Sequence, residues 1–145
     1  MEARISRESA LLRIAGIFAE RSTCQRKKAG CVITQDHRVV ASGYNGSPAG
    51  LPHCIDDDCL IDEQTGGCIR TVHAEAAAIS FAARAGVRLE GSRLYTTLAP
   101  CLPCAKLIIN AGIREVYYTE AYRDRRGVEL LQSTDGIFIT PGEVF

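Results

Sequence analysis

The sequence lacks an excess of either charge, since 17 lysines and arginines balance 17 aspartates and glutamates in 145 residues. It therefore has no overall positive field to attract nucleic acid, although a small basic cluster can still act locally. It also lacks an apolar run of membrane-spanning length, and residues 1–16 carry scattered charges instead of a signal-peptide core. We therefore expect a cytoplasmic protein with no membrane contact and no stable nucleic-acid partner.

Cysteine, in contrast, is plentiful, with seven residues in the chain. In a reducing compartment, thiols serve metal binding or catalysis more often than disulfides. Apolar residues make up 46% of the chain and charged residues 23%, which is ordinary for a globular protein. At this length, one catalytic domain over residues 1–145 with a real core is expected.

Two short stretches carry the predicted chemistry, namely H-A-E from His73 to Glu75 and P-C-L-P-C from Pro100 to Cys104. One imidazole and two thiolates, from His73, Cys101 and Cys104, supply three zinc ligands and leave the fourth tetrahedral position for water. Glu75 is not needed as a ligand, so it can take a proton from that water and pass it to the substrate. A C-x-x-C redox pair and a closed structural zinc site are the alternatives, but neither requires H-x-E upstream.

Both stretches are predicted to begin helices. Residues 72–85 are rich in alanine and end at Gly86, and residues 101–111 end at Gly112, as expected for glycine C-caps. Pro103 is tolerated because it falls in the first turn. The helix dipole and free N–H groups favour thiolates at such a position. Two helix starts that face each other would bring all four side chains together.

The remaining pattern predicts a layered α/β protein. Further helices are expected over 6–21 and 126–133, and strands over 30–34, 38–43, 92–98, 115–119 and 137–140. The first two strands form an antiparallel hairpin, and the later alternation of strand and helix implies parallel crossovers, so the sheet should be mixed. Residues 53–70 form an irregular insert.

The H-x-E and P-C-x-x-C pattern is the signature of the zinc nucleobase deaminases. Three further stretches resemble the deoxycytidylate (dCMP) deaminases of the bacterial and phage branch, including the late-competence-operon type. They are R-S-T-C-Q-R at 21–26, G-Y-N-G-S-P-A-G at 43–50, and the cysteine-containing segment 53–73. The resemblance implies the cytidine-deaminase fold, a three-layer α/β/α sandwich with a five-stranded mixed sheet. It also implies hydrolysis of dCMP to dUMP and ammonia, which supplies dUMP for thymidylate synthesis.

A nucleotide enzyme needs a cation for the 5′-phosphate, and arginine suits bidentate phosphate binding best. Arg26 begins the densest basic run of the chain, and the resembling family carries arginine at this place, so Arg26 is the predicted phosphate ligand. The alternative is a solvated loop charge, which we favour for Lys27 and Lys28. By resemblance, Tyr122 lies near the phosphate, with an ordinary rim aromatic as the alternative.

By resemblance, Asn45 hydrogen-bonds the sugar or base, and Ala74 also belongs to the substrate site. The alternative for Asn45 is a turn residue that holds its own backbone. One departure concerns Ala77, because the family usually shows H-A-E-x-N-A with asparagine there. A missing amide would remove a hydrogen bond that supports the zinc ligands. The consequence would be a changed rate of deamination or a modified cytosine as substrate. None of the predicted zinc ligands would be lost.

A second zinc is predicted in the insert, because the segment has little apolar content and metal ligation would order it. Cys31 is not a candidate ligand, because it lies within a predicted strand and is most simply a small core residue. The candidate ligands are Cys24, Cys54, Cys59 and Cys68, with His53 as a substitute. The expected site is closed and uses thiolates alone or with one imidazole; the alternative is a set of unconnected loop thiols.

The resemblance further implies a homo-oligomer, often a hexamer, that dCTP activates and dTTP inhibits, with Mg²⁺ bound to the effector. Two other hypotheses stay open. The first is a deaminase of a 5-modified dCMP, of another nucleotide or nucleoside, or of tRNA. The second is a non-catalytic, metal-stabilised binding module, which would not require Glu75.

Overall fold

A mixed five-stranded sheet with the order β2-β1-β3-β4-β5 forms the centre of the computed structural model, which describes residues 3–144. The strands are β1 (Gly30–Gln35), β2 (Arg38–Tyr44), β3 (Arg93–Leu98), β4 (Glu115–Glu120) and β5 (Phe138–Pro141). β1 runs antiparallel to both β2 and β3, whereas β3, β4 and β5 are mutually parallel. The predicted hairpin and the predicted mixed sheet are therefore confirmed.

The hairpin turn shows why the chain reverses where it does. Asp36 and His37 both have positive φ angles, 49° and 65°, between β1 and β2. Two consecutive left-handed residues match the right-handed twist of the flanking strands, and aspartate tolerates this conformation better than most residues.

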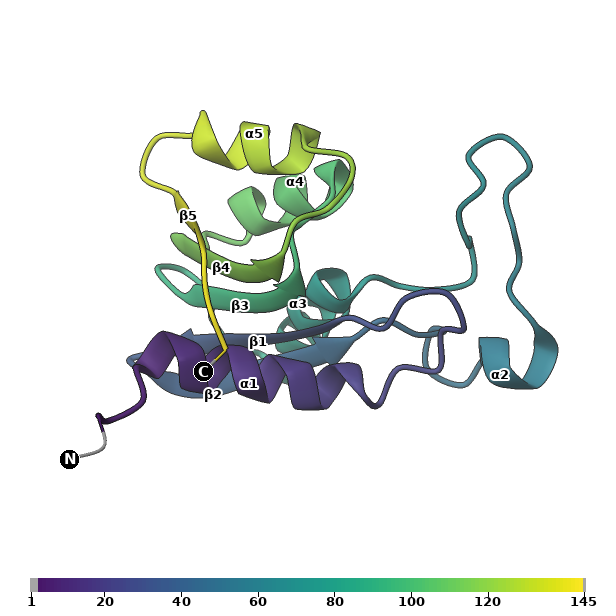
Figure 1. Ribbon diagram of the computed structural model, residues 1–145, viewed down its shortest axis with the longest axis horizontal. Helices are drawn as coiled ribbons and strands as arrows, with labels where there is room; N and C mark the ends of the chain where they lie inside the picture. The colour runs from purple at the N-terminus through teal and green to yellow at the C-terminus, as the bar shows by residue number, and fades with distance from the viewer. Residues whose placement is uncertain (1–2, 145) are drawn as a thin grey trace.

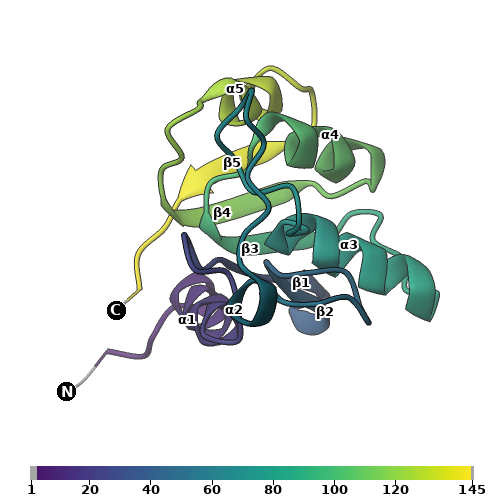
Figure 2. The same ribbon diagram turned by 90° about the vertical axis from the view of Figure 1, so that its right-hand side faces the viewer.

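Helices cover both faces of the sheet (Figures 1 and 2). The helices of the described residues are α1 (Arg7–Ala19), α2 (Cys54–Asp57), α3 (Ala74–Ala85), α4 (Leu102–Asn110) and α5 (Arg126–Gln132), of which the short α2 lies in the insert, away from the sheet. On one face, Leu12 and Ala15 of α1 pack against Val32 and Tyr95. On the other face, α3, α4 and α5 share a larger core with the sheet. The sandwich therefore has three layers, as predicted. No helix in residues 3–144 is both long and apolar enough to cross a bilayer.

The insert projects from the sandwich (Figure 1). It is not wholly irregular, because α2 forms one helical turn and Ile61 pairs with Cys68 in an isolated bridge. At its end the chain returns to the sandwich, where Val72 and Gly46 exchange backbone hydrogen bonds of 2.7 and 3.2 Å. This pairing fixes the chain immediately before His73.

Candidate active site

The site lies where two helices begin. His73 is the N-cap residue of α3 and Cys101 is the N-cap residue of α4, so neither side chain extends from within its helix. His73 Nδ1 lies 3.2 Å from Cys101 Sγ and 3.5 Å from Cys104 Sγ. The two helix starts therefore face each other, and they bring together His73, Cys101 and Cys104, hereafter the helix-start group.

The helix-start group has the spacing that zinc requires. Its three donor atoms all lie within 4.8 Å of one another. Zinc bonds of roughly 2.0–2.3 Å at tetrahedral angles place neighbouring ligand atoms about 3.5 Å apart, close to the two distances between nitrogen and sulfur. One imidazole and two thiols are also ligands that zinc accepts. The residues present fit a zinc ion without rearrangement of the backbone.

Hydrogen bonding within the helix-start group favours a thiolate. Contact with Cys104 and then with His73 lowers the pKa of Cys101 to about 4, although partial burial opposes the shift. The same contact with Cys101 raises the pKa of His73 above its usual value. A thiolate at Cys101 is the form that binds a metal.

Glu75 is buried beside these ligands, with only 5% of its surface exposed. Burial is the largest effect on this carboxyl and raises its pKa. The Thr96 hydroxyl lies 2.9 Å from Glu75 Oε1 and 3.0 Å from the Leu98 carbonyl oxygen, so one proton is shared between two acceptors. A carboxyl group with a raised pKa next to a metal site can both accept and return a proton near neutral pH.

The group opens onto a cleft of about 500 Å³. All four predicted substrate residues line it, namely Arg26, Asn45, Ala74 and Tyr122, as do His73, Glu75 and Cys101. These residues lie far apart along the chain, and the fold brings them to one cleft, as the sequence analysis predicted.

Asn45 has a structural role that the sequence did not reveal. Its Oδ1 accepts a 2.8 Å hydrogen bond from the Ala29 N–H, and its Nδ2 donates a 2.6 Å bond to the Lys27 carbonyl. It thus holds the backbone of another segment and not its own. A primary amide has a second donor and a second lone pair, so capacity for a ligand remains.

Two of the three side chains of the basic run 26–28, those of Arg26 and Lys27, line the cleft. Arg26 Nη1 donates a 2.5 Å hydrogen bond to the Gly66 carbonyl oxygen of the insert. Lys27 Nζ bonds both carboxylate oxygens of Glu120, at 2.8 and 2.7 Å. Lys27 is therefore part of the cleft wall and not a free loop charge, whereas Lys28 is exposed and lies outside the lining.

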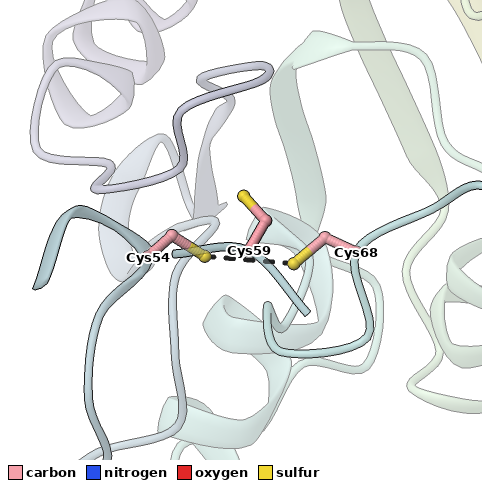
Figure 3. A group of neighbouring side chains, drawn as sticks. All are labelled: Cys54, Cys59 and Cys68. Carbon is pink, nitrogen blue, oxygen red and sulfur yellow. Dashed lines mark hydrogen bonds between the residues drawn. The ribbon is translucent and has the colours of Figure 1, made fainter. Parts of the chain in front are cut away.

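A second group of thiols lies in the insert. Cys54, Cys59 and Cys68, hereafter the insert group, have Sγ atoms within 4.8 Å of one another (Figure 3). The Cys54 and Cys68 sulfurs are 3.9 Å apart, close to the roughly 3.8 Å edge of a tetrahedral zinc–thiolate site. Burial opposes the shift, but backbone N–H groups at Arg70 and Thr71 lower the pKa of Cys68 to about 7.

The other two candidates for this second site lie elsewhere. Cys24 is buried and is not within the insert group. His53 Nδ1 is 3.0 Å from the Thr23 hydroxyl and is likewise outside the group. Three of the candidate ligands are therefore assembled in the insert, and a fourth ligand would have to come from solvent or from a movement of Cys24 or His53.

Similarity to known proteins agrees with this geometry. A family model described as "Cytidine and deoxycytidylate deaminase zinc-binding region" matches residues 5–120. The chain belongs to this family. It is 41% identical over 142 residues to ComE operon protein 2 of Bacillus subtilis, covering 97% of this chain and 74% of that protein. It is 35% identical to the deoxycytidylate deaminase of Saccharomyces cerevisiae, covering 90% of this chain and 43% of the yeast protein.

A solved structure of the same family is similar over nearly the whole chain. The crystal structure of dCMP deaminase from the cyanophage S-TIM5 in complex with dCMP and dUMP superposes with a TM-score of 0.84. The two chains are 29% identical, and the match covers 97% of this chain and all of the phage chain. The cytidine-deaminase-like fold predicted from the sequence is confirmed.

The family usually has asparagine where this chain has Ala77, and the position of Ala77 limits what this difference can change. Ala77 faces β2, because a Cβ atom at Gly43 would lie 3.0 Å from the Ala77 Cβ. It does not line the cleft. The missing amide therefore affects how α3 packs on β2 more directly than it affects the substrate pocket.

Proposed function

We propose that the protein is a zinc-dependent deaminase that converts dCMP to dUMP and ammonia. The observation that carries this proposal is the buried Glu75 beside the helix-start group, in a cleft that Arg26 and Arg123 also line. A zinc-binding module without catalysis has no need of a buried carboxylate, because isolated burial of a charge is costly. Membership of the family and the dCMP named for the phage structure support the same substrate.

The chain's own residues account for the steps around the metal. When bound to His73, Cys101 and Cys104, zinc would supply a Lewis acid that makes water acidic near neutral pH. Glu75 takes a proton from that water at its carboxylate and delivers it to the cytosine ring nitrogen as the water oxygen adds to C4. A second proton, from the added hydroxyl, then passes through Glu75 to the amine, which leaves as ammonia. Thr96 holds the carboxylate in place through the 2.9 Å contact.

The phosphate assignment follows from the direction of the cleft. With the base at the helix-start group, the 5′ end would point outward, toward the exposed Arg26 and the half-buried Tyr122, which also line the cleft. Arg26 uses one nitrogen on Gly66, and its guanidinium has further donors for a phosphate. Asn45 and Ala74 are buried residues of the cleft lining, and we propose that they contact the sugar or base. Together they favour a nucleotide over a nucleoside.

The insert group is proposed to hold a second, structural zinc. The Cys54–Cys68 separation supports it, and so does the exposure of apolar side chains in the insert, such as Ile55 and Ile69, which do not form a core there. We also retain as proposals a homo-oligomer, regulation by dCTP and dTTP with Mg²⁺, and a cytoplasmic location, which all seven free thiols suit.

The experiment is an ammonia-release assay with dCMP, deoxycytidine, 5-substituted dCMP and tRNA as substrates. We expect kcat/KM for dCMP to exceed that for deoxycytidine by at least tenfold, as one charge-assisted contact provides. Equal values would contradict the nucleotide assignment. A preference for the 5-substituted nucleotide would keep the phosphate site and change the assigned base, whereas turnover of tRNA alone would overturn both.

A further inference from the structure

Gly127, the second residue of α5, lies against the backbone of the loop that carries Cys101. A Cβ atom at this position would lie 2.6 Å from the Cys101 carbonyl carbon and 2.7 Å from its oxygen, and it would also press on the Pro100 carbonyl oxygen. The φ angle of Gly127 is not positive, so its backbone conformation does not require glycine. The need for glycine comes from this close approach alone.

Neither of the two segments can withdraw freely. The Cys101 carbonyl oxygen accepts a 2.9 Å hydrogen bond from the Ala105 N–H, which begins α4. On the other side, Val128 and Leu131 anchor α5 in the core, with 5% and 0% of their surfaces exposed. A side chain at Gly127 would therefore act on the Cys101 peptide, on the seating of α5, or on both.

The same segment also continues into the wall of the cleft. Tyr122 and Arg123 line the cleft only five and four residues before Gly127, respectively. Between Arg123 and Gly127, Asp124 Oδ1 accepts a 3.0 Å hydrogen bond from the Arg126 N–H, and the Asp124 carboxylate pairs with the Arg126 guanidinium at 2.7 Å. This turn fixes the path from the cleft wall to the zinc-ligand loop.

We propose that Gly127 is a positioning residue for the deamination reaction. Because it has no side chain, the start of α5 can rest directly on the Cys101 peptide and set the direction from which Cys101 Sγ meets the metal. The inference rests on the proposed function for the identity of the metal and of the reaction. It adds a residue that neither binds the metal nor lines the cleft.

The test uses Gly127→Ala in the full chain, with cobalt in place of zinc. We expect the visible cobalt bands and the sulfur-to-cobalt charge-transfer band to shift, and the metal to pass faster to a chelator. With zinc, kcat should fall roughly ten- to hundredfold, as a small misplacement near the chemistry does. KM for dCMP should stay within about threefold, because the binding contacts are retained.

Two other glycines provide matched controls. Gly16 has no atom within 4 Å of a Cβ, so Gly16→Ala should leave spectrum, metal retention and turnover unchanged. Gly30 is as crowded as Gly127, with a Cβ 2.5 Å from the Ala19 N–H nitrogen on the α1 face. Gly30→Ala should lower the melting temperature and yet keep the cobalt spectrum of the native protein.

A Gly127→Ala variant with lowered melting temperature but native cobalt bands and metal retention would overturn the proposal. If this variant does not fold, Asp124→Ala decides, because it loosens the same turn and adds no atom at Cys101. Faster loss of metal to the chelator supports the proposal, and unchanged loss overturns it. Altered cobalt bands in Gly127→Ala, with no dCMP turnover in the native protein, would reject the proposed substrate and retain the role of Gly127.

Discussion

The helix-start group and the insert group each bring three metal-ligating side chains within 4.8 Å, but their surroundings differ. The first lies at the starts of α3 and α4 beside a buried carboxyl group and opens onto a cleft. The second lies on a projecting segment that includes exposed apolar side chains such as Ile55 and Ile69. Similar donor atoms thus lie in two different surroundings.

The difference indicates that the ligands do not decide the chemistry by themselves. Catalysis needs a group that moves protons and a space for the substrate. The helix-start group has the buried Glu75 and the cleft beside it, whereas the insert group borders the cleft through Cys68 and has no buried carboxyl group next to it in the described residues. The insert group has the features of a cross-link for a segment that cannot bury a core of its own. Arg26 joins the two regions, since it lines the cleft and bonds the insert at Gly66.

The largest expected effect comes from the carboxyl group that distinguishes the two regions. Glu75→Gln should lower turnover of dCMP by about 10²–10⁴-fold, because proton transfer is lost. Zinc content should not change, since all ligands remain. The control is Glu8→Gln, the same chemical change in the first turn of α1. Near-normal turnover in Glu75→Gln would remove Glu75 from the mechanism.

Arg26→Ala tests the link between the regions. Loss of a charge-assisted contact to phosphate costs roughly 1.5–3 kcal/mol, which is about ten- to hundredfold in kcat/KM for dCMP. Deoxycytidine turnover should change little. Lys28→Ala is the matched control, because Lys28 is exposed and outside the cleft lining. An equal loss for both substrates would show that Arg26 acts through the insert and not through the phosphate.

Cys59→Ser should separate structural from catalytic metal. Elemental analysis should give two zinc ions per native chain and one in the variant, and the insert should become sensitive to proteolysis. Turnover should fall only a few-fold, because Gly67 and Cys68 contribute to the cleft wall. Cys24→Ser should keep both ions, and loss of one ion there would identify Cys24 as the fourth ligand. One ion in the native protein would exclude the second site.

Thr96→Val should give the smallest change, a displaced pH profile. Burial raises the pKa of Glu75, and the Thr96 hydrogen bond lowers it in part, so removal of the hydroxyl raises the pKa further. The base is then ionised only at higher pH, and the acid limb of kcat/KM moves upward. Thr34→Val is the control, since the Thr34 hydroxyl is buried without a partner in the described residues. Coincident acid limbs would contradict the role of Thr96.

Much of the site could be predicted because it follows local rules. His73 and Cys101 stand at helix starts, which alanine-rich composition, a first-turn proline and the glycine C-caps of the sequence indicate. The hairpin of β1 and β2 could likewise be predicted from local sequence. The short helix α2 was missed, because four residues give no periodicity to detect.

The contacts that could not be predicted join distant parts of the chain. Thr96 is an ordinary strand residue until the fold places it against Glu75. Lys27 was interpreted as a solvated charge, because nothing in the sequence pairs it with Glu120, 93 residues away. Gly127 gave no signal in the sequence, since its close approach to Cys101 exists only in three dimensions.

The most direct test of the two-region account is a zinc-edge anomalous difference map of crystals grown with dUMP. The account predicts one peak among His73, Cys101 and Cys104, with the base of the nucleotide beside it and the phosphate toward Arg26. It predicts a second peak among the insert thiols, with no nucleotide atom among the ligands of that ion. A map without the first peak, or with the base of the nucleotide bound at the second, would contradict the account.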